Sequence, residues 1–248
     1  MPCLVTQNKS TDLYSCDTEP VGRRQDARDR TERRIVELGR RQLADVGAAG
    51  LSLRAIARDL GLVSSAVYRY VASRDDLLTL LLVDAYTELA ETVDRAAGDA
   101  GDHWRTQLRA MSRALRGWAV DHRAEWALLY GSPVPGYRAP RDRTVGPGTR
   151  VIGALLAAVS AGAATGEVTG GPPVDLSPTL TADLAALRTE FGVSVGDAAL
   201  VKSLLLWAAL IGAVNLEVFG HYGPDTFTGP AEVFDVQVEL LLDMLAQN

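Results

Sequence analysis

The 248-residue sequence predicts an all-α protein that has a small N-terminal unit and a larger C-terminal helical body. Apolar residues recur at spacings of three and four between breaks rich in glycine and proline, which is the period of amphipathic helices. Charge is also divided unevenly, because residues 21–74 hold twelve arginines against six acidic residues while the whole chain carries −6. The remainder therefore carries −12, which indicates one end that faces nucleic acid and a body that repels it.

The composition fits a soluble globular protein, since 47% of the residues are hydrophobic and 23% are charged. The longest uncharged segment, residues 151–166, is mostly alanine and glycine and favours a buried helix over a membrane span. No hydrophobic signal region follows Met1, so we expect a cytoplasmic protein without membrane partners. Cys3 and Cys16 are the only cysteines, which supports neither a disulfide framework nor a metal site.

The N-terminal unit is expected to begin after a disordered tail at residues 1–25, which lacks apolar periodicity and contains Pro20 and Gly22. A first helix is predicted over residues 31–46. Its apolar face comprises Ile35, Leu38, Leu43 and Val46.

Residues 51–76 predict a helix-turn-helix. Ser52 can cap a short helix that Gly61 ends, and Ser64 can cap a second short helix. The first of these helices has Leu53, Ile56, Ala57 and Leu60 on its apolar face, and the second has Val63, Ala66, Val67 and Tyr70. The hydroxyls, phenol and guanidinium of Ser65, Tyr68 and Arg69 point elsewhere and can hydrogen-bond base edges and phosphates. An ordinary helical hairpin with a polar solvent face is the alternative.

The run RTERRIVELGRRQLADVGAAGLSLRAIARDLGLVSSAVYRYVASRDDLLTLL resembles the N-terminal DNA-binding domain of the tetracycline-repressor (TetR) family of regulators. The features that carry the resemblance are Thr31, Gly47, Ser52, Ala57, Gly61, Tyr68-Arg69-Tyr70 and Ser73-Arg74. The resemblance implies a helix-turn-helix domain at residues 26–75 and a ligand-binding and dimerisation domain at 76–248. It also implies a homodimer that binds a double-stranded DNA operator and a small-molecule effector, without a cofactor.

Twelve residues are predicted to contact DNA. The resemblance places Arg23, Arg24 and Arg28 in an arm that reaches phosphates or the minor groove, with a solvated basic tail as the alternative. Ser52 and Arg54 begin a helix whose amide end favours phosphate. The remaining members are Leu53, Ser64, Ser65, Tyr68, Arg69, Tyr70 and Arg74.

The body is predicted to contain helices at residues 75–94, 104–118, 124–130, 149–164, 179–191 and 197–219, and a last helix from Pro230. The helix at 75–94 joins the DNA-binding unit to the body, so it is the expected lever between them. The last two helices are apolar around more than half of their circumference. A four-helix bundle between two subunits would cover them, and an internal core is the alternative.

Large apolar side chains spread over several body helices predict a pocket for an apolar or aromatic effector, with simple core packing as the alternative. They are Trp104, Met111, Trp118, Trp126, Tyr130 and Trp207. The body also resembles the WHG subclass of ligand domains, in which a helix commonly reads Trp, three residues, His-Gly. Ile211 replaces that histidine between Trp207 and Gly212, so no role of the histidine is carried over.

Motifs of catalysis and metal binding are missing from the sequence. It contains no phosphate-binding glycine loop, zinc-ligand spacing or HExxH, and His103, His122 and His221 are scattered. The sequence therefore predicts a ligand-responsive transcriptional regulator, more specifically a repressor, rather than an enzyme. A small-molecule-binding protein or an enzyme without specific DNA binding is the alternative.

Overall fold

The structure is a computed structural model that describes residues 21–169 and 175–246. These residues form helices and no strands, so the predicted all-α class is confirmed. The elements are α1 (Val21–Val46), η1 (Ala48–Gly50), α2 (Leu53–Asp59), α3 (Ser64–Val67), α4 (Arg74–Asp99), α5 (Trp104–Asp121), α6 (Arg123–Tyr130), α7 (Arg141–Ala164), α8 (Pro178–Phe191), α9 (Asp197–Val218) and α10 (Pro230–Ala246).

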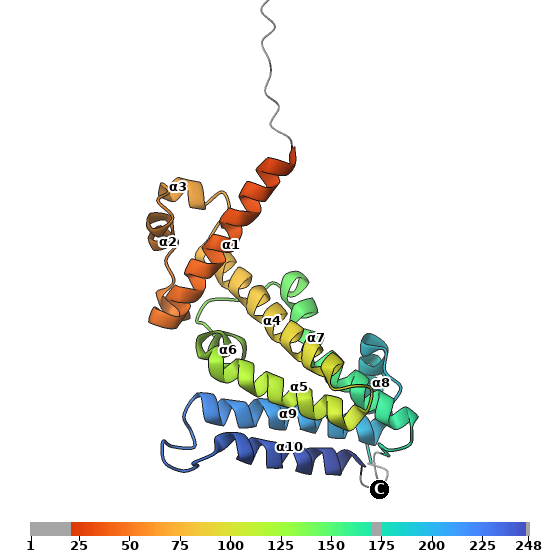
Figure 1. The fold of residues 1–248 in the computed structure, drawn as a ribbon. Coiled ribbons are helices and arrows are strands. Elements are labelled where there is room, and N and C mark those ends of the chain that lie inside the picture. Colours follow the sequence, from red (N-terminus) through yellow and green to blue (C-terminus); the bar gives the residue numbers. More distant parts are fainter. Residues whose placement is uncertain (1–20, 170–174, 247–248) are drawn as a thin grey trace, which may run out of the picture.

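Helices α1 to α3 form a small unit at one end of the molecule, and α4 runs from this unit into the body (Figure 1). Each part has its own hydrophobic core. Ile35, Ile56 and Val67 belong to the core of the N-terminal unit, whereas Leu89, Leu108 and Leu200 belong to the core of the body. The buried face of α4 serves both cores, because its first turns pack on α1 and its later turns pack on α5 and α7.

The first helix is longer than the sequence predicted. Helix α1 begins at Val21, so the predicted disorder of residues 21–25 is wrong, while residues 1–20 lie outside the described part. Side-chain pairs four residues apart extend the helix toward its N-terminus. The Gln25 amide donates to Asp29 over 2.8 Å, and the Arg28 guanidinium pairs with Glu32 over 2.8 Å.

Helix α6 packs against both cores. Ala124 and Leu128 contact the core of the N-terminal unit, whereas Trp126 is fully buried in the core of the body. Helix α6 contacts α1 on one side and α4, α5 and α9 on the others. It is therefore a second connection between the two parts, beside α4.

Helix α7 begins at Arg141, eight residues before its predicted start, and continues through Pro147. Gly148 lies where α7 approaches α4, because a Cβ atom there would lie 3.4 Å from the Tyr86 ring. Helices α7 and α9 are also long and apolar enough to cross a membrane by length and composition alone, a test that core helices of soluble proteins also pass. Both helices contribute to the core of the body.

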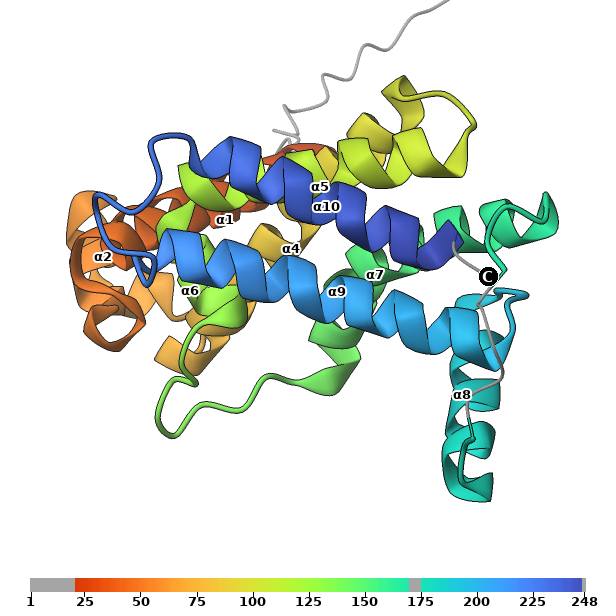
Figure 2. The ribbon, with the colours of Figure 1, turned by 90° about the horizontal axis from the view of Figure 1, so that it is seen from below.

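Helices α9 and α10 run antiparallel across one face of the body, and Figure 2 shows them side by side in front of the other helices. Their inner sides are buried, as at Leu206 and Leu242. On the opposite side, Leu205, Leu216, Val236 and Leu240 have between 42% and 64% of their surface exposed. We call these four residues the apolar face.

Candidate DNA-binding surface and effector region

Hydrogen bonds at both ends of α2 fix the helix-turn-helix. The Ser52 hydroxyl accepts from the Ala55 amide over 3.3 Å, which confirms the predicted cap. At the other end, the Gly61 amide donates to the Arg58 carbonyl over 3.0 Å and the Leu62 amide donates to the Ala57 carbonyl over 2.9 Å. These two bonds are a Schellman motif, whose left-handed position Gly61 occupies with φ +67°.

Helix α3 follows two residues after this motif and is a single helical turn. Val63 is its N-cap residue and makes no side-chain cap, so the predicted cap at Ser64 is wrong. The reason is geometric: Val63 has the extended backbone of a cap, whereas Ser64 is already helical. The fully buried side chain of Val67 anchors the turn in the core of the N-terminal unit.

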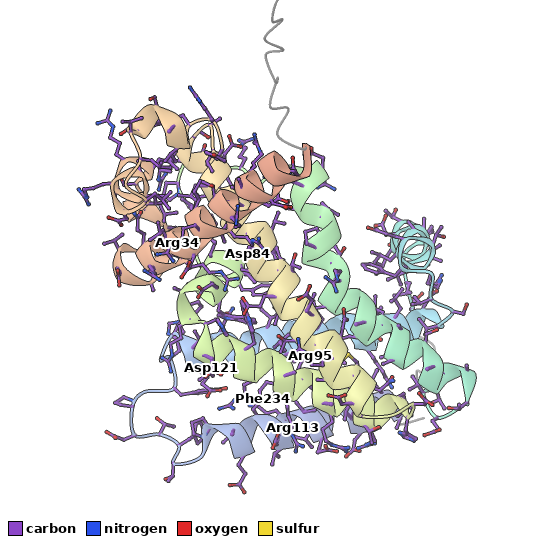
Figure 3. All side chains as sticks on the ribbon, turned by 45° about the horizontal axis from the view of Figure 1, so that its top comes forward. Arg34, Asp84, Arg95, Arg113, Asp121 and Phe234 are labelled. Atoms are coloured by element: carbon purple, nitrogen blue, oxygen red, sulfur yellow. The ribbon has the colours of Figure 1, made fainter. Side chains whose placement is uncertain are left out.

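The outer side of this motif exposes polar and positively charged groups. Ser64, Ser65, Tyr68 and Arg69 are exposed on and directly after α3. Arg54 is exposed on α2, as is Arg58, whose side chain is 80% exposed. We call these six exposed residues, Ser64, Ser65, Tyr68, Arg69, Arg54 and Arg58, the recognition surface. They belong to the small N-terminal unit, from which nitrogen-tipped side chains project outward in Figure 3.

Three other predicted DNA-contacting residues are packed or paired within the protein. Leu53 is 6% exposed and belongs to the core, so its side chain is not available to DNA. Arg74 donates to the Ala48 carbonyl over 2.8 Å and fixes the start of α4 to η1. The guanidinium of Arg28 pairs with Glu32 and lies 5.5 Å from the centre of the half-buried Tyr70 ring. The sequence pattern had already placed Leu53 on the apolar face with Ile56 and Ala57, and the structure shows that this burial holds and that the DNA-contact prediction for its side chain is wrong.

Arg23 and Arg24 lie in the first turns of α1 and not in an extended arm. Their side chains lie outside the described part of the chain. A helical position still leaves arginines at this end of α1 able to contact phosphate, and their contact with DNA stays a prediction.

Three of the six residues predicted to bind an effector meet in the body. Tyr130 is central: its ring lies 4.5 Å from Trp126 and 6.2 Å from Trp207, measured between ring centres. Tyr86 of α4, which the sequence analysis missed, also lies 6.2 Å from Tyr130. We call these four residues the aromatic cluster. The Trp126 indole donates to the Asn215 side chain over 2.8 Å.

Burial keeps the two phenols of the aromatic cluster neutral. It raises the pKa of Tyr130, and the neighbouring Tyr86 raises it further. Burial also raises the pKa of Tyr86. The cluster therefore presents rings and hydroxyls, without ionised groups, to anything that enters it.

The other three predicted residues lie elsewhere on α5. Trp104 is 14 residues before Trp118, which corresponds to about 21 Å along a helix. The Trp104 indole donates to Glu167 over 3.0 Å and its ring covers Gly162. Met111 is fully buried, and Trp118 stacks on His122 with ring centres 4.8 Å apart. These three residues share the buried face of α5, but they do not form one effector site with the other three.

None of these six residues lines the cavities that we describe. The first, of about 450 Å³, lies between α9 and α10 and is lined by residues such as Gly212 and Leu241. Another, of about 680 Å³, lies between α1 and α4, and a third, of about 440 Å³, lies between α1, α6 and the end of α9. Among the described residues, no group of three or more His, Cys, Asp and Glu side chains could hold a metal ion.

A capped helix-turn-helix with an exposed, arginine-rich outer side, joined to a separate helical body, defines a helix-turn-helix DNA-binding protein. Comparison with known proteins agrees. Residues 35–81 match the family described as bacterial regulatory proteins, tetR family, and residues 108–241 match the tetracyclin repressor-like C-terminal domain. The chain belongs to the TetR family of transcriptional regulators, which confirms the resemblance found in the sequence.

Similar proteins extend over nearly the whole chain. The HTH-type transcriptional regulator Rv1816 of Mycobacterium tuberculosis is 58% identical and covers 94% of this chain and 100% of its own length. The crystal structure of the regulatory protein SCO4313 is 30% identical, with a TM-score of 0.72 over 88% of this chain and 98% of that chain. A tetR-family protein from Rhodococcus RHA1, 17% identical, shares the fold with a TM-score of 0.58 over 87% of this chain and 97% of its own.

Proposed function

We propose that this regulator is a cytoplasmic homodimer that represses transcription from a palindromic operator and is released by a small apolar or aromatic effector. The observation that carries the proposal is the recognition surface, where two hydroxyls are exposed on the short helix α3, a phenol and an arginine directly after it, and two further arginines on α2. The N-terminal residues of such a helix contact base edges in the major groove, and neighbouring arginines hold phosphates.

The apolar face supports the homodimer. Its four large side chains are exposed on two neighbouring helices, and a groove of about 450 Å³ between these helices is lined mainly by apolar residues. Contiguous apolar surface of this kind is typical of an interface. A twofold axis through the face would bring α9 and α10 of two subunits together as a four-helix bundle, and it would present two recognition surfaces to a palindrome.

Similarity to a named repressor supports repression. The HTH-type transcriptional repressor DrrR1 of Streptomyces coeruleorubidus is 38% identical over 95 residues, which is 38% of this chain and 33% of that protein. A dimer that occupies a promoter blocks access to it, so the same DNA-binding unit suffices for repression.

The aromatic cluster is the proposed effector region. Its rings come from α4, α6 and α9, so a molecule inserted among them would displace α4 and α6, which also contact the N-terminal unit. Helix α6 transmits such a displacement directly, because Ala124 and Leu128 on its other side pack against the N-terminal core. An uncharged aromatic compound fits the cluster best, since its two buried phenols stay neutral.

The test of DNA binding uses the purified protein and the intergenic DNA upstream of its own gene. We expect Tyr68→Ala to weaken binding roughly fivefold to 150-fold, corresponding to the loss of about 1–3 kcal/mol for one specific contact. Leu180→Ala, which truncates an exposed side chain of α8 outside the recognition surface and the apolar face, is the control. Unchanged affinity of a folded Tyr68→Ala variant, measured by fluorescence anisotropy, would remove α3 from the interface.

Salt dependence tests the arginines of α1. If Arg23, Arg24 and Arg28 all contact phosphates, their joint replacement by glutamine flattens the slope of log affinity against log salt by about five per dimer, because each neutralised phosphate releases roughly 0.9 counterion. An unaltered slope would assign these side chains to solvent.

The effector is tested by reciprocity. A compound that lowers operator affinity a hundredfold must itself bind about a hundredfold more weakly to the operator complex, which is roughly 2.7 kcal/mol of coupling. Tryptophan fluorescence with and without saturating operator measures both affinities, and equal values exclude the compound as an inducer. A Trp207→Phe variant reports whether binding occurs at the aromatic cluster.

A further inference from the structure

Val63 is the most exposed large apolar side chain among the described residues, with 71% of its surface accessible. It lies between Gly61, which ends α2, and Ser64, which begins α3. The sequence pattern had placed Val63 on the buried side of the second helix, together with Val67. Only Val67 is buried, so the exposure of Val63 needs a different explanation.

Val63 also breaks the capping rule that the neighbouring helices follow. Ser52 caps α2 and Ser73 caps α4, each by accepting a hydrogen bond from a backbone amide. Valine cannot accept such a bond and is among the poorest N-cap residues. Positions that violate local structural preferences in this way are expected at functional sites, so Val63 is a candidate for a role in binding.

The surroundings of Val63 identify what covers it. Leu62 and Tyr68, which lie within five residues of Val63 in the sequence, are 37% and 46% exposed, and Arg54, Arg58 and Arg69 are exposed in the same helix-turn-helix. Double-stranded DNA complements a surface that exposes both arginines and apolar side chains. Its phosphates attract the arginines, and its major groove contains one kind of apolar group. In the major groove only the C5-methyl group of thymine offers apolar contact to a side chain.

We propose that Val63 reads the methyl group of a thymine in each half-site and is a determinant of operator specificity. The assignment rests on the proposed function, in which α3 enters the major groove. The removal of one methyl group from water changes binding about fourfold, and two symmetric half-sites together change it roughly fifteenfold. A change in affinity of this size lets the protein discriminate between operators that differ at this thymine and still bind both of them.

The experiment uses a duplex selected from random DNA by the wild-type dimer. Each thymine is replaced in turn by deoxyuridine, which removes only the methyl group. We expect one symmetric pair of positions at which the replacement weakens wild-type binding roughly fifteenfold. The same replacement should have a smaller effect on Val63→Ala, which keeps one methyl group, and little effect on Val63→Ser. Replacements at all other thymines should affect the three proteins equally.

Val63→Ser separates recognition from helix stability, because serine can restore the missing cap of α3. We expect this variant to unfold at a higher temperature than the wild type and yet to lose the discrimination between thymine and deoxyuridine. If the wild type selects no duplex, the proposed function fails. If it selects one but no deoxyuridine effect depends on residue 63, the inference about Val63 alone is overturned.

Discussion

A buried ion pair between α5 and α9 stabilises the body, and its contribution can be compared with that of a matched exposed pair. The Arg116 guanidinium donates to both carboxylate oxygens of Glu217, and the two side chains are only 18% and 13% exposed. Arg116 also lies 6.0 Å from the centre of the Phe234 ring of α10. Glu217→Gln keeps the shape of the side chain but leaves the guanidinium without a countercharge.

We expect Glu217→Gln to lower the free energy of unfolding by about 2–3 kcal/mol, because a largely buried cation loses a charged acceptor. The matched control is Asp235→Asn. Asp235 accepts two hydrogen bonds from Arg113 in the same way, but these side chains are 55% exposed for Arg113 and 38% for Asp235 (Figure 3). Water screens this pair, so the control should cost less than about 1 kcal/mol.

Urea denaturation at one fixed protein concentration measures both variants, since a dimer's stability depends on concentration. Thermal unfolding should show a decrease of roughly 5–10 °C for Glu217→Gln and less than about 4 °C for Asp235→Asn. Equal losses for the two variants would refute the reasoning from burial. Replacing Arg116 and Glu217 together by leucine should recover much of the loss, because no unpaired charge then remains.

Three other variants test separate parts of the body. Gly162→Ala should lower the free energy of unfolding by about 1–3 kcal/mol in urea denaturation, because its methyl group would lie 2.7 Å from the Trp104 ring. A hydrogen bond from Arg109 lowers the pKa of Glu239, so the pair stabilises the protein at neutral pH and loses this effect as the pH falls below about 4.5. Glu239→Gln should therefore be less stable than the wild type at neutral pH and show a smaller loss in acid denaturation. Leu240→Glu should yield monomers in analytical ultracentrifugation, whereas an unchanged mass would exclude the apolar face as the interface.

Local signals in the sequence were sufficient to predict most of the helix-turn-helix. Ser52 caps α2 as expected, and Gly61 ends it, because capping depends on a few neighbouring residues. The start of α3 was predicted one residue late. A serine beside a valine suggests a cap at the serine, but the extended backbone that defines the cap lies at Val63 and is fixed by the preceding Schellman motif.

The predicted effector residues show what a helical pattern cannot provide. Trp104 and Trp118 share the buried face of α5, yet one packs at Gly162 and the other on His122. Periodicity identifies which side of a helix is buried but not which neighbouring helix covers each turn. The cluster around Tyr130 depends on the packing of α4 and α9 against α6, which involves residues far apart in the sequence.

The double role of α6 constrains how regulators of this build can be recombined. A chimera that joins this body to the DNA-binding unit of a relative would leave Ala124 and Leu128 facing a foreign core, although both lie roughly 60 residues beyond α3. Transferring the relative's residues at these two positions together with its first three helices should restore the packing of α6 against the core of the N-terminal unit. In this fold the smallest exchangeable module is therefore discontinuous in sequence, and selection on operator specificity also acts on a helix that does not enter the DNA.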